Sequence, residues 1–164
     1  MRTLRVAASA AMLLAAACGD NPSSPPAANK LPAGEVVALT PLTGFSPHYS
    51  AFDKPARVVV TSDTIWARIA GELFTQGAAR PAIDFSREIV LFAAMGTRSS
   101  GGFRIEIERA VRTDGAVVAE VVETSPGGNC ISTQALTRPV YAVRMARPDA
   151  SVSFVERKVV HECS

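Results

Sequence analysis

Residues 102–111 carry the pattern that most constrains the fold of this chain. Apolar and charged side chains alternate there, in the order Phe103, Arg104, Ile105, Glu106, Ile107 and Glu108. A period of two places one face of a β-strand in a hydrophobic core and the other face in water. Asp114 and Gly115 tolerate the positive φ angles of a type I′ turn, and the apolar stretch 116–124 follows them. The sequence therefore predicts a β-hairpin with one buried face.

Four other short apolar runs predict further strands. These runs are residues 56–61, 88–95, 140–145 and 152–160. Their length and aliphatic composition are typical of buried strands, and the turn-forming residues Pro148 and Asp149 separate the last two. We therefore predict that residues 33–164 form a single, mainly β domain with an antiparallel, sandwich-like arrangement.

One amphipathic helix is expected within this domain, at about residues 63–75. Its apolar residues recur at helical spacing: Ile65, Trp66, Ile69, Ala70 and Leu73. Ser62 or Asp63 provides an N-cap, and Gly77 marks the end. Trp66 invites a ligand-binding interpretation. An aromatic residue on the apolar stripe of an amphipathic helix is more typical of a core, and we predict a core position.

The first 18 residues have the pattern of a lipoprotein export signal. Arg2 and Arg5 precede an apolar run, and three alanines lead directly into Cys18. The run is shorter than the roughly 20 residues that span a bilayer. Residues 1–17 are therefore predicted to be a lipoprotein signal peptide, and Cys18 to be lipidated after cleavage. An ordinary cleaved signal peptide is the alternative interpretation.

Residues 18–32 are predicted to form a flexible tether behind the lipidated cysteine. Almost nothing in this segment can be buried, and it contains four prolines. In polyproline conformation, at about 3.1 Å per residue, it would hold a domain roughly 40 Å from the lipid surface. A retention signal for the inner membrane of the Cys-Asp type has aspartate directly after the lipidated cysteine. Asp20 is third in the mature chain, so this signal is absent. We therefore expect a lipid-anchored protein of the bacterial cell envelope, at the outer rather than the inner membrane.

The charge balance argues against nucleic acid as a partner. Removing residues 1–17 takes two arginines from the 17 basic residues and leaves 15 against 15 acidic residues. The mature chain is then formally neutral, and no polybasic block remains to follow a phosphate backbone.

The cysteines predict one disulfide bond. Lipidation of Cys18 leaves Cys130 and Cys163 free to pair, and an exported chain meets oxidising conditions. Such a bond would stabilise the fold by roughly 3–4 kcal/mol in the chain-entropy model. A cysteine metal site is the competing interpretation. His161 and Cys163 are only two positions apart and make a poor zinc site, so no metal is expected.

Sequence signatures of catalysis are scarce. The chain has no Gly-x-Ser-x-Gly elbow, no His-Glu-x-x-His motif and no phosphate loop. Only His48 and His161 are available as bases at neutral pH. Ser99 or Ser100 with His161 could form a dyad, but nothing in the spacing favours it. We therefore predict a protein that is not an enzyme and needs no cofactor.

Three loops are candidates for contact with another protein. They are residues 96–103, 125–129 and 137–139, each at the edge of a predicted strand. The candidate contact residues are Ser99, Ser100, Gly101, Gly102, Phe103, Pro126, Gly127, Gly128, Arg138 and Pro139. Paired glycines permit close approach of a partner. Tight turns without a binding role are the plainer interpretation of the same residues.

Several ordered motifs resemble the PrcB C-terminal domain, the family of a protease complex subunit. They are Asp84-Phe85-Ser86-Arg87-Glu88-Ile89-Val90, Gly96 followed by Ser100-Gly101-Gly102-Phe103, Glu123-Thr124-Ser125-Pro126-Gly127, and Thr133-Gln134-Ala135-Leu136-Thr137-Arg138-Pro139. The resemblance runs over about residues 56–147 and takes in the Trp66 helix. It implies the β fold and an accessory role beside an exported protease.

The order of the three loops is also similar to that of chagasin-type inhibitors of cysteine proteases. Ser100 to Phe103, Pro126 to Asn129 and Arg138-Pro139 would be the counterparts of the inhibitor loops. The first loop lacks an opening Asn-Pro, and Val140 stands where an aromatic residue follows Arg-Pro in that family.

These observations favour a non-catalytic, lipid-anchored cell-envelope protein. Its β domain is predicted to bind another exported protein, as accessory subunit of a protease. A chagasin-like protease inhibitor is the alternative hypothesis, and a small hydrolase is the third.

Overall fold

The computed structural model describes residues 30–74 and 79–163. The predicted signal peptide, Cys18 and most of the predicted tether lie outside these residues. The elements, in chain order, are β1 (Glu35–Val37), β2 (Thr40–Pro41), β3 (Pro55–Val60), α1 (Asp63–Leu73), β4 (Glu88–Met95), β5 (Arg104–Thr113), β6 (Ala116–Pro126), β7 (Val140–Ala146) and β8 (Ser151–His161). The predicted mainly β fold with one short helix is confirmed.

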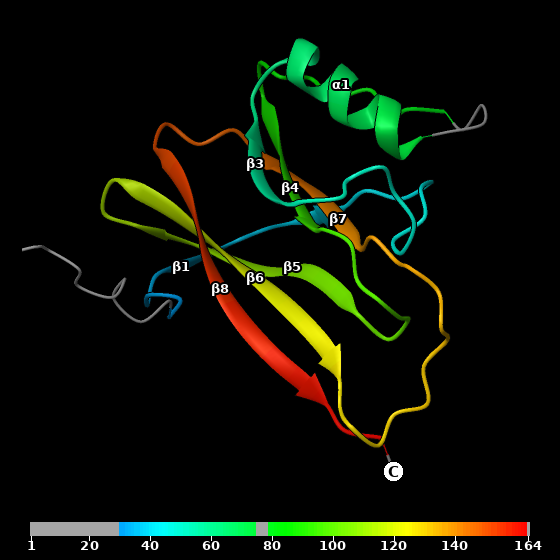
Figure 1. Ribbon diagram of the computed structural model, residues 1–164. Coiled ribbons are helices and arrows are strands. Elements are labelled where there is room, and N and C mark those ends of the chain that lie inside the picture. The colour runs from blue at the N-terminus through cyan, green and yellow to red at the C-terminus, as the bar shows by residue number, and fades with distance from the viewer. Residues whose placement is uncertain (1–29, 75–78, 164) are drawn as a thin grey trace, which may run out of the picture.

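The strands form two sheets that pack face to face, and α1 covers the outer face of one of them (Figure 1). The strand order is β1-β5-β6-β8 in the first sheet and β2-β7-β4-β3 in the second. All pairings are antiparallel except that of β6 with β8, which is parallel. A parallel pair needs a crossover connection, and β7 lies in that crossover, in the other sheet.

The predicted hairpin is the β5–β6 pair. Gly115 has a φ of 84°, the positive value that the turn requires. A β-bulge between Ile107 and Arg109 shifts the register, so that the alternation of the first half does not continue unchanged. Ile105 and Ile107 are buried between the sheets, as their period of two predicted.

Strand β4 is apolar at nearly every position because both of its faces are buried. Its alternate residues Leu91 and Ala93 face the first sheet, whereas Val90 and Phe92 face α1. A strand in the middle of three layers is buried on both sides and loses the alternation of a surface strand. This strand therefore belongs to two hydrophobic cores at once.

Helix α1 ends at Leu73, two residues before the predicted boundary; the predicted stop at Gly77 lies outside the described residues. Phe74 leaves the helical conformation with φ −95° and ψ 68°, and its ring packs edge-on against Phe45 and Trp66. Ser62 occupies the N-cap position, but its side chain makes no capping hydrogen bond. The predicted helix is correct in place and face, and shorter than expected.

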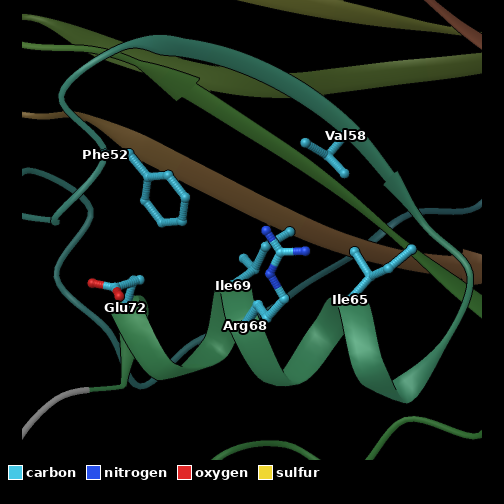
Figure 2. A pocket seen from close by; sticks show the side chains of 6 residues that line it. All are labelled: Phe52, Val58, Ile65, Arg68, Ile69 and Glu72. Carbon is cyan, nitrogen blue, oxygen red and sulfur yellow. The ribbon is translucent and has the colours of Figure 1, made fainter.

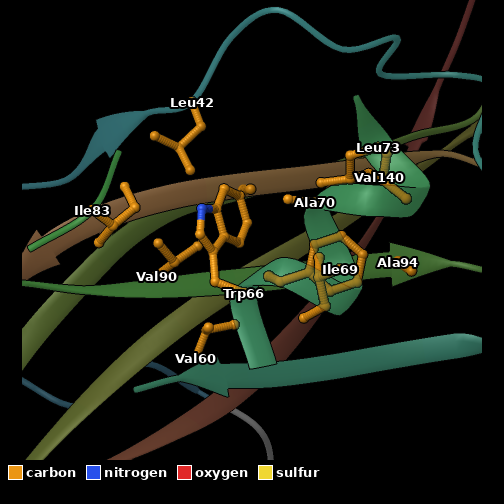
Figure 3. Packing of buried hydrophobic residues seen from close by; sticks show 12 residues of the cluster. Leu42, Val60, Trp66, Ile69, Ala70, Leu73, Ile83, Val90, Ala94 and Val140 are labelled. Atoms are coloured by element: carbon orange, nitrogen blue, oxygen red, sulfur yellow. The ribbon is translucent and has the colours of Figure 1, made fainter. Parts of the chain in front are cut away.

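Trp66 is a core residue, as predicted. It is 1 % exposed and lies among the apolar side chains beneath α1 (Figure 3). Its indole Nε1 donates a hydrogen bond to the carbonyl of Pro81 over 3.2 Å, which satisfies the one polar atom of the ring. Trp66 thereby also fixes the chain between α1 and β4.

Candidate protein-contact site

The three loops singled out in the sequence lie together at one end of the sandwich (Figure 1). The backbones of Arg98 and Thr137 exchange hydrogen bonds of 2.8 and 3.0 Å. The Gly101 amide donates to Thr133 over 2.9 Å, and the Thr137 hydroxyl donates to the Ser100 carbonyl over 2.8 Å. We call this region, residues 44–54, 96–103, 125–139 and 161–163, the loop end. Its loops form one connected unit.

A further segment, residues 46–50, joins these loops although its sequence did not predict it. The Arg138 amide donates to the His48 carbonyl over 2.8 Å, and the Ser50 hydroxyl donates to the Arg138 carbonyl over 3.0 Å. The Arg138 guanidinium also reaches Thr97, with 3.2 Å between Nε and Oγ1. Arg138 therefore joins loops from three parts of the chain.

The candidate contact residues differ in how far they are exposed. Ser99, Gly102 and Gly128 are exposed, and the partly buried ones are Ser100, Gly101, Phe103, Pro126, Gly127 and Arg138. Pro139 is fully buried, so its ring cannot touch a partner and instead supports the loop from inside. Gly102 has a φ of +83°, and a Cβ there would lie 3.0 Å from Pro126. Gly102 is therefore also explained as part of a tight turn without a binding role.

Exposed apolar side chains surround the joined loops. Tyr49 is 61 % exposed, Leu136 is 64 % exposed and Ile131 is fully exposed. Exposed large apolar side chains cost free energy in water, so these three residues are candidates for contact with another molecule. Ile131 and Leu136 were not predicted as contact residues, because the segment that contains them has no periodicity.

A disulfide bond closes the loop end. Cys130 and Cys163 are joined, as predicted, and the bond ties the β6–β7 connection to the end of β8. The Gly127 amide donates to the His161 carbonyl over 2.8 Å beside it. The long connection is thus fastened at its start by the disulfide and at its end by Thr137 and Arg138.

Charged side chains occupy the space between the sheets at the loop end. Arg57 of β3 donates from Nη2 to Glu123 of β6 over 2.5 Å, and from Nη1 to the Ala94 carbonyl over 2.7 Å. Its Nε lies 3.2 Å from Glu156 of β8, without hydrogen-bond geometry. Both Arg57 and Glu123 are largely buried. The pair therefore links the two sheets where the apolar core ends.

The imagined serine–histidine dyad does not form. The Ser100 hydroxyl donates to the carbonyl of Gly101 over 3.1 Å, and no hydrogen bond joins Ser99 or Ser100 to His161 in the described residues. His48 and His161 do line one small pocket of about 160 Å³. In residues 30–74 and 79–163, no three His, Cys, Asp or Glu side chains gather as metal ligands. The same residues contain no helix long and apolar enough to cross a membrane.

A second hollow lies beside α1, outside the loop end. It has a volume of about 630 Å³ and runs between the helix and β3 (Figure 2). Phe52, Val58, Ile65 and Ile69 make it apolar, and Arg68 and Glu72 supply its charged groups. The groove has the size of a ligand site, but it lacks a set of convergent polar groups that would orient a ligand.

The pKa of the Tyr141 hydroxyl, on β7, lies above its ordinary value. Burial raises the pKa of its hydroxyl, and the negative charge of Glu106 adds to the rise. The hydroxyl therefore stays neutral at physiological pH.

The comparison with protein families bears directly on the loop end. Residues 89–146 match the PrcB C-terminal family model. The match spans β4 to β7 and includes the loops around Gly101, Gly127 and Arg138, whereas α1 and β8 lie outside it. No curated protein and no solved structure matches the chain. The match over residues 89–146 thus confirms the resemblance to the PrcB C-terminal family that the ordered motifs indicated.

Proposed function

We propose that this chain is a non-catalytic, lipid-anchored envelope protein that binds another exported protein through the loop end. The observation that carries the proposal is the exposure of Tyr49, Ile131 and Leu136 around loops that hydrogen bonds and a disulfide hold together. A preorganised surface binds without the entropic cost of ordering its loops. Exposed aromatic and aliphatic side chains supply the contacts that dominate such interfaces.

The PrcB C-terminal match supports a protease as the partner, because the loops in question fall within the matched residues. In this role the domain is an accessory subunit. The chagasin-like inhibitor hypothesis uses the same surface, and the structure does bring its three loops to one end. The two roles differ in one observable: an accessory subunit preserves or raises the activity of the bound protease, and an inhibitor lowers it.

Lipid attachment through Cys18 is the second part of the proposal. The evidence is the sequence pattern alone, because Cys18 lies outside the described residues. Cys18→Ser should move the protein from the membrane fraction to the soluble fraction after cell lysis. Continued sedimentation of the variant with membranes would contradict the anchor. Separating the inner from the outer membranes and measuring which of them contains the native protein tests the expected outer location.

Site-specific photo-crosslinking in the native cell tests the contact surface. We would place a photoreactive residue at Leu136, and a matched one at Val36 of β1, which is 72 % exposed and lies away from the loop end. Leu136 should give a discrete adduct that Val36 does not give. Ile131→Asp should abolish the adduct, because it places a charge on the apolar contact. Equal adducts from both positions would contradict the proposal.

The identity of the adduct then separates the two roles. If the captured protein is a protease, the purified chain is added to it and its rate on a peptide substrate is measured. A preserved or raised rate supports the accessory role, whereas a fall that saturates with concentration supports inhibition. An adduct that contains only envelope structural proteins would contradict the protease association.

A further inference from the structure

A small pocket opens between the two sheets at the loop end. It has a volume of about 170 Å³ and is lined by Met95, Arg98, Phe103, Glu123, Ser125 and Lys158. Drug-sized ligands occupy pockets of about 300–1,000 Å³. This pocket is therefore of the size that admits one polar side chain, and it adjoins the exposed residues of the loop end.

Arg98 enters this pocket without a partner that satisfies it. The carboxylate of Glu123 is held by Arg57 over 2.5 Å, and Arg98 reaches the other oxygen only at 3.9 Å. The Arg98 Nε is buried and has no hydrogen-bond partner among the described residues. A buried, unsatisfied donor on a charged group costs free energy. An acceptor that reached this donor would recover that cost as binding free energy.

Lys158 adds a second positive charge to the same pocket. It is opposite Glu123 in the parallel β6–β8 register, yet it makes no ion pair in the described part of the chain. A second nearby acid, Glu156, forms an ion pair with Arg57. Arg57, Arg98 and Lys158 thus face Glu123 and Glu156, which leaves one positive charge in excess at the mouth of the pocket.

The geometry of Arg98 selects among anions. Its guanidinium lies over the ring of Phe103, with 5.8 Å from Cζ to the ring centroid. Such a cation–π contact favours the position of the guanidinium beside the ring. A planar guanidinium matches the two oxygens of a carboxylate, and a nearby ammonium strengthens the attraction as a point charge.

We propose that this pocket receives an aspartate or glutamate side chain of the protein that docks on the loop end, held between Arg98 and Lys158. The proposal rests on the proposed function, because the acid is supplied by the docked partner. In this arrangement the exposed apolar residues provide the contact area, and the buried carboxylate fixes the register of the partner.

A direct test uses the purified full-length chain in detergent micelles and a blocked amino acid, N-acetyl-glutamate methylamide. The nuclear magnetic resonance signals of the Arg98 Nε–H group and of the Ser125 backbone amide, which the Arg98 variant retains, are followed during titration at constant ionic strength. A saturable shift is expected for this probe and none for the neutral analogue N-acetyl-glutamine methylamide. Arg98→Gln and Lys158→Gln should each weaken binding by roughly ten- to a hundredfold. Arg68→Gln, an exposed position on α1, is the matched control and should leave binding unchanged.

The proposal would be overturned by the absence of a saturable shift, by an equal response to the glutamine analogue, or by undiminished binding to Lys158→Gln with its unfolding midpoint retained. Inorganic phosphate that binds more tightly than the glutamate probe would also overturn it. A Leu136 adduct without binding of the probe would refute the pocket alone. Binding of the probe without a Leu136 adduct would refute the proposed docking surface.

Discussion

Arg147 and Arg98 lie at opposite ends of the sandwich and differ in how their guanidinium groups are satisfied. At the end away from the loops, which we call the turn end and define as residues 61–62, 84–87 and 146–150, Arg147 connects separate segments. Its Nη1 donates to the carbonyls of Phe85 over 2.8 Å and Thr61 over 3.3 Å, and its amide donates to Arg87 over 2.7 Å. Arg147 satisfies backbone acceptors of the same chain.

At the loop end, Arg98 has a buried Nε without a partner and a distant carboxylate. Exposed Leu136 and Ile131 accompany it, whereas the exposed large apolar residues found among the described residues do not include any from the turn end. Arg147 is thus satisfied by its own chain, whereas at the loop end a buried donor of Arg98 and several exposed apolar side chains have no partner among the described residues. This difference motivates the proposal that the loop end, and not the turn end, binds another protein.

The largest expected effect comes from removing the covalent bond of the loop end. The double substitution Cys130→Ser and Cys163→Ser opens a loop with a sequence separation of 33 residues. We expect the free energy of unfolding to fall by about 3–4 kcal/mol in the chain-entropy model. Urea unfolding measures this loss, and reduction of the native protein should reproduce it. If neither changes the unfolding midpoint, the loop end is held by its hydrogen bonds alone.

The second effect tests the ion pair between the sheets. Glu123→Gln should cost about 1–3 kcal/mol, because it leaves the largely buried guanidinium of Arg57 with a weaker partner. Replacing both residues, with Arg57→Met and Glu123→Leu, should recover much of that loss, since no unpaired charge remains. Urea unfolding of the three proteins compares them. A double variant less stable than Glu123→Gln would show that the pair itself stabilises the loop end.

Sequence reasoning predicted the elements in which a local pattern and the fold agree. The hairpin around Gly115 and the apolar run of β4 are of this kind, because alternation and continuous burial leave direct marks in the sequence. The short strands β1 and β2 were missed, since three and two residues are too few to show a period. The parallel pairing of β8 with β6 depends on a crossover, which no local pattern records.

The site was predictable only in its separate pieces. The glycine loops were found from composition, but their junction with residues 46–50 comes from hydrogen bonds between segments far apart in the chain. Pro139 and Leu136 lie in one motif, and only the fold makes one buried and the other exposed. Glu123 continues the inward face of β6, yet its partner Arg57 comes from the other sheet.

Replacing each arginine in turn with glutamine tests the contrast between Arg147 and Arg98. Arg147→Gln should lower the free energy of unfolding by about 1–2 kcal/mol, through the loss of two side-chain hydrogen bonds at the turn end. Arg98→Gln should change it by less than about 0.5 kcal/mol, because that guanidinium satisfies few groups of its own chain. Thermal or urea unfolding of the two variants and the native chain measures both changes. A larger loss for Arg98→Gln would reverse the assignment of the two ends.

The smallest effect concerns Asp84 at the turn end. The Ser86 hydroxyl donates to its carboxylate over 2.6 Å and the Ser86 amide over 3.0 Å. These hydrogen bonds, with a smaller contribution from the charge of Arg87, lower the pKa of Asp84 below its ordinary value of 3.8. A carboxylate whose pKa is lower in the folded state stabilises the fold above its unfolded pKa, and this contribution is lost as the pH falls through the folded pKa.

Asp84→Asn should therefore be less stable than the native chain at neutral pH, and the two unfolding curves should converge as the pH falls below 3.8. Ser86→Ala should remove most of the same pH dependence, because it deletes the hydroxyl that contributes most to the lowered pKa. Urea unfolding at a series of pH values measures both. A stability difference that does not change with pH would mean that Asp84 acts through the shape of its turn and not through its charge, and that the turn end holds together without a titrating group.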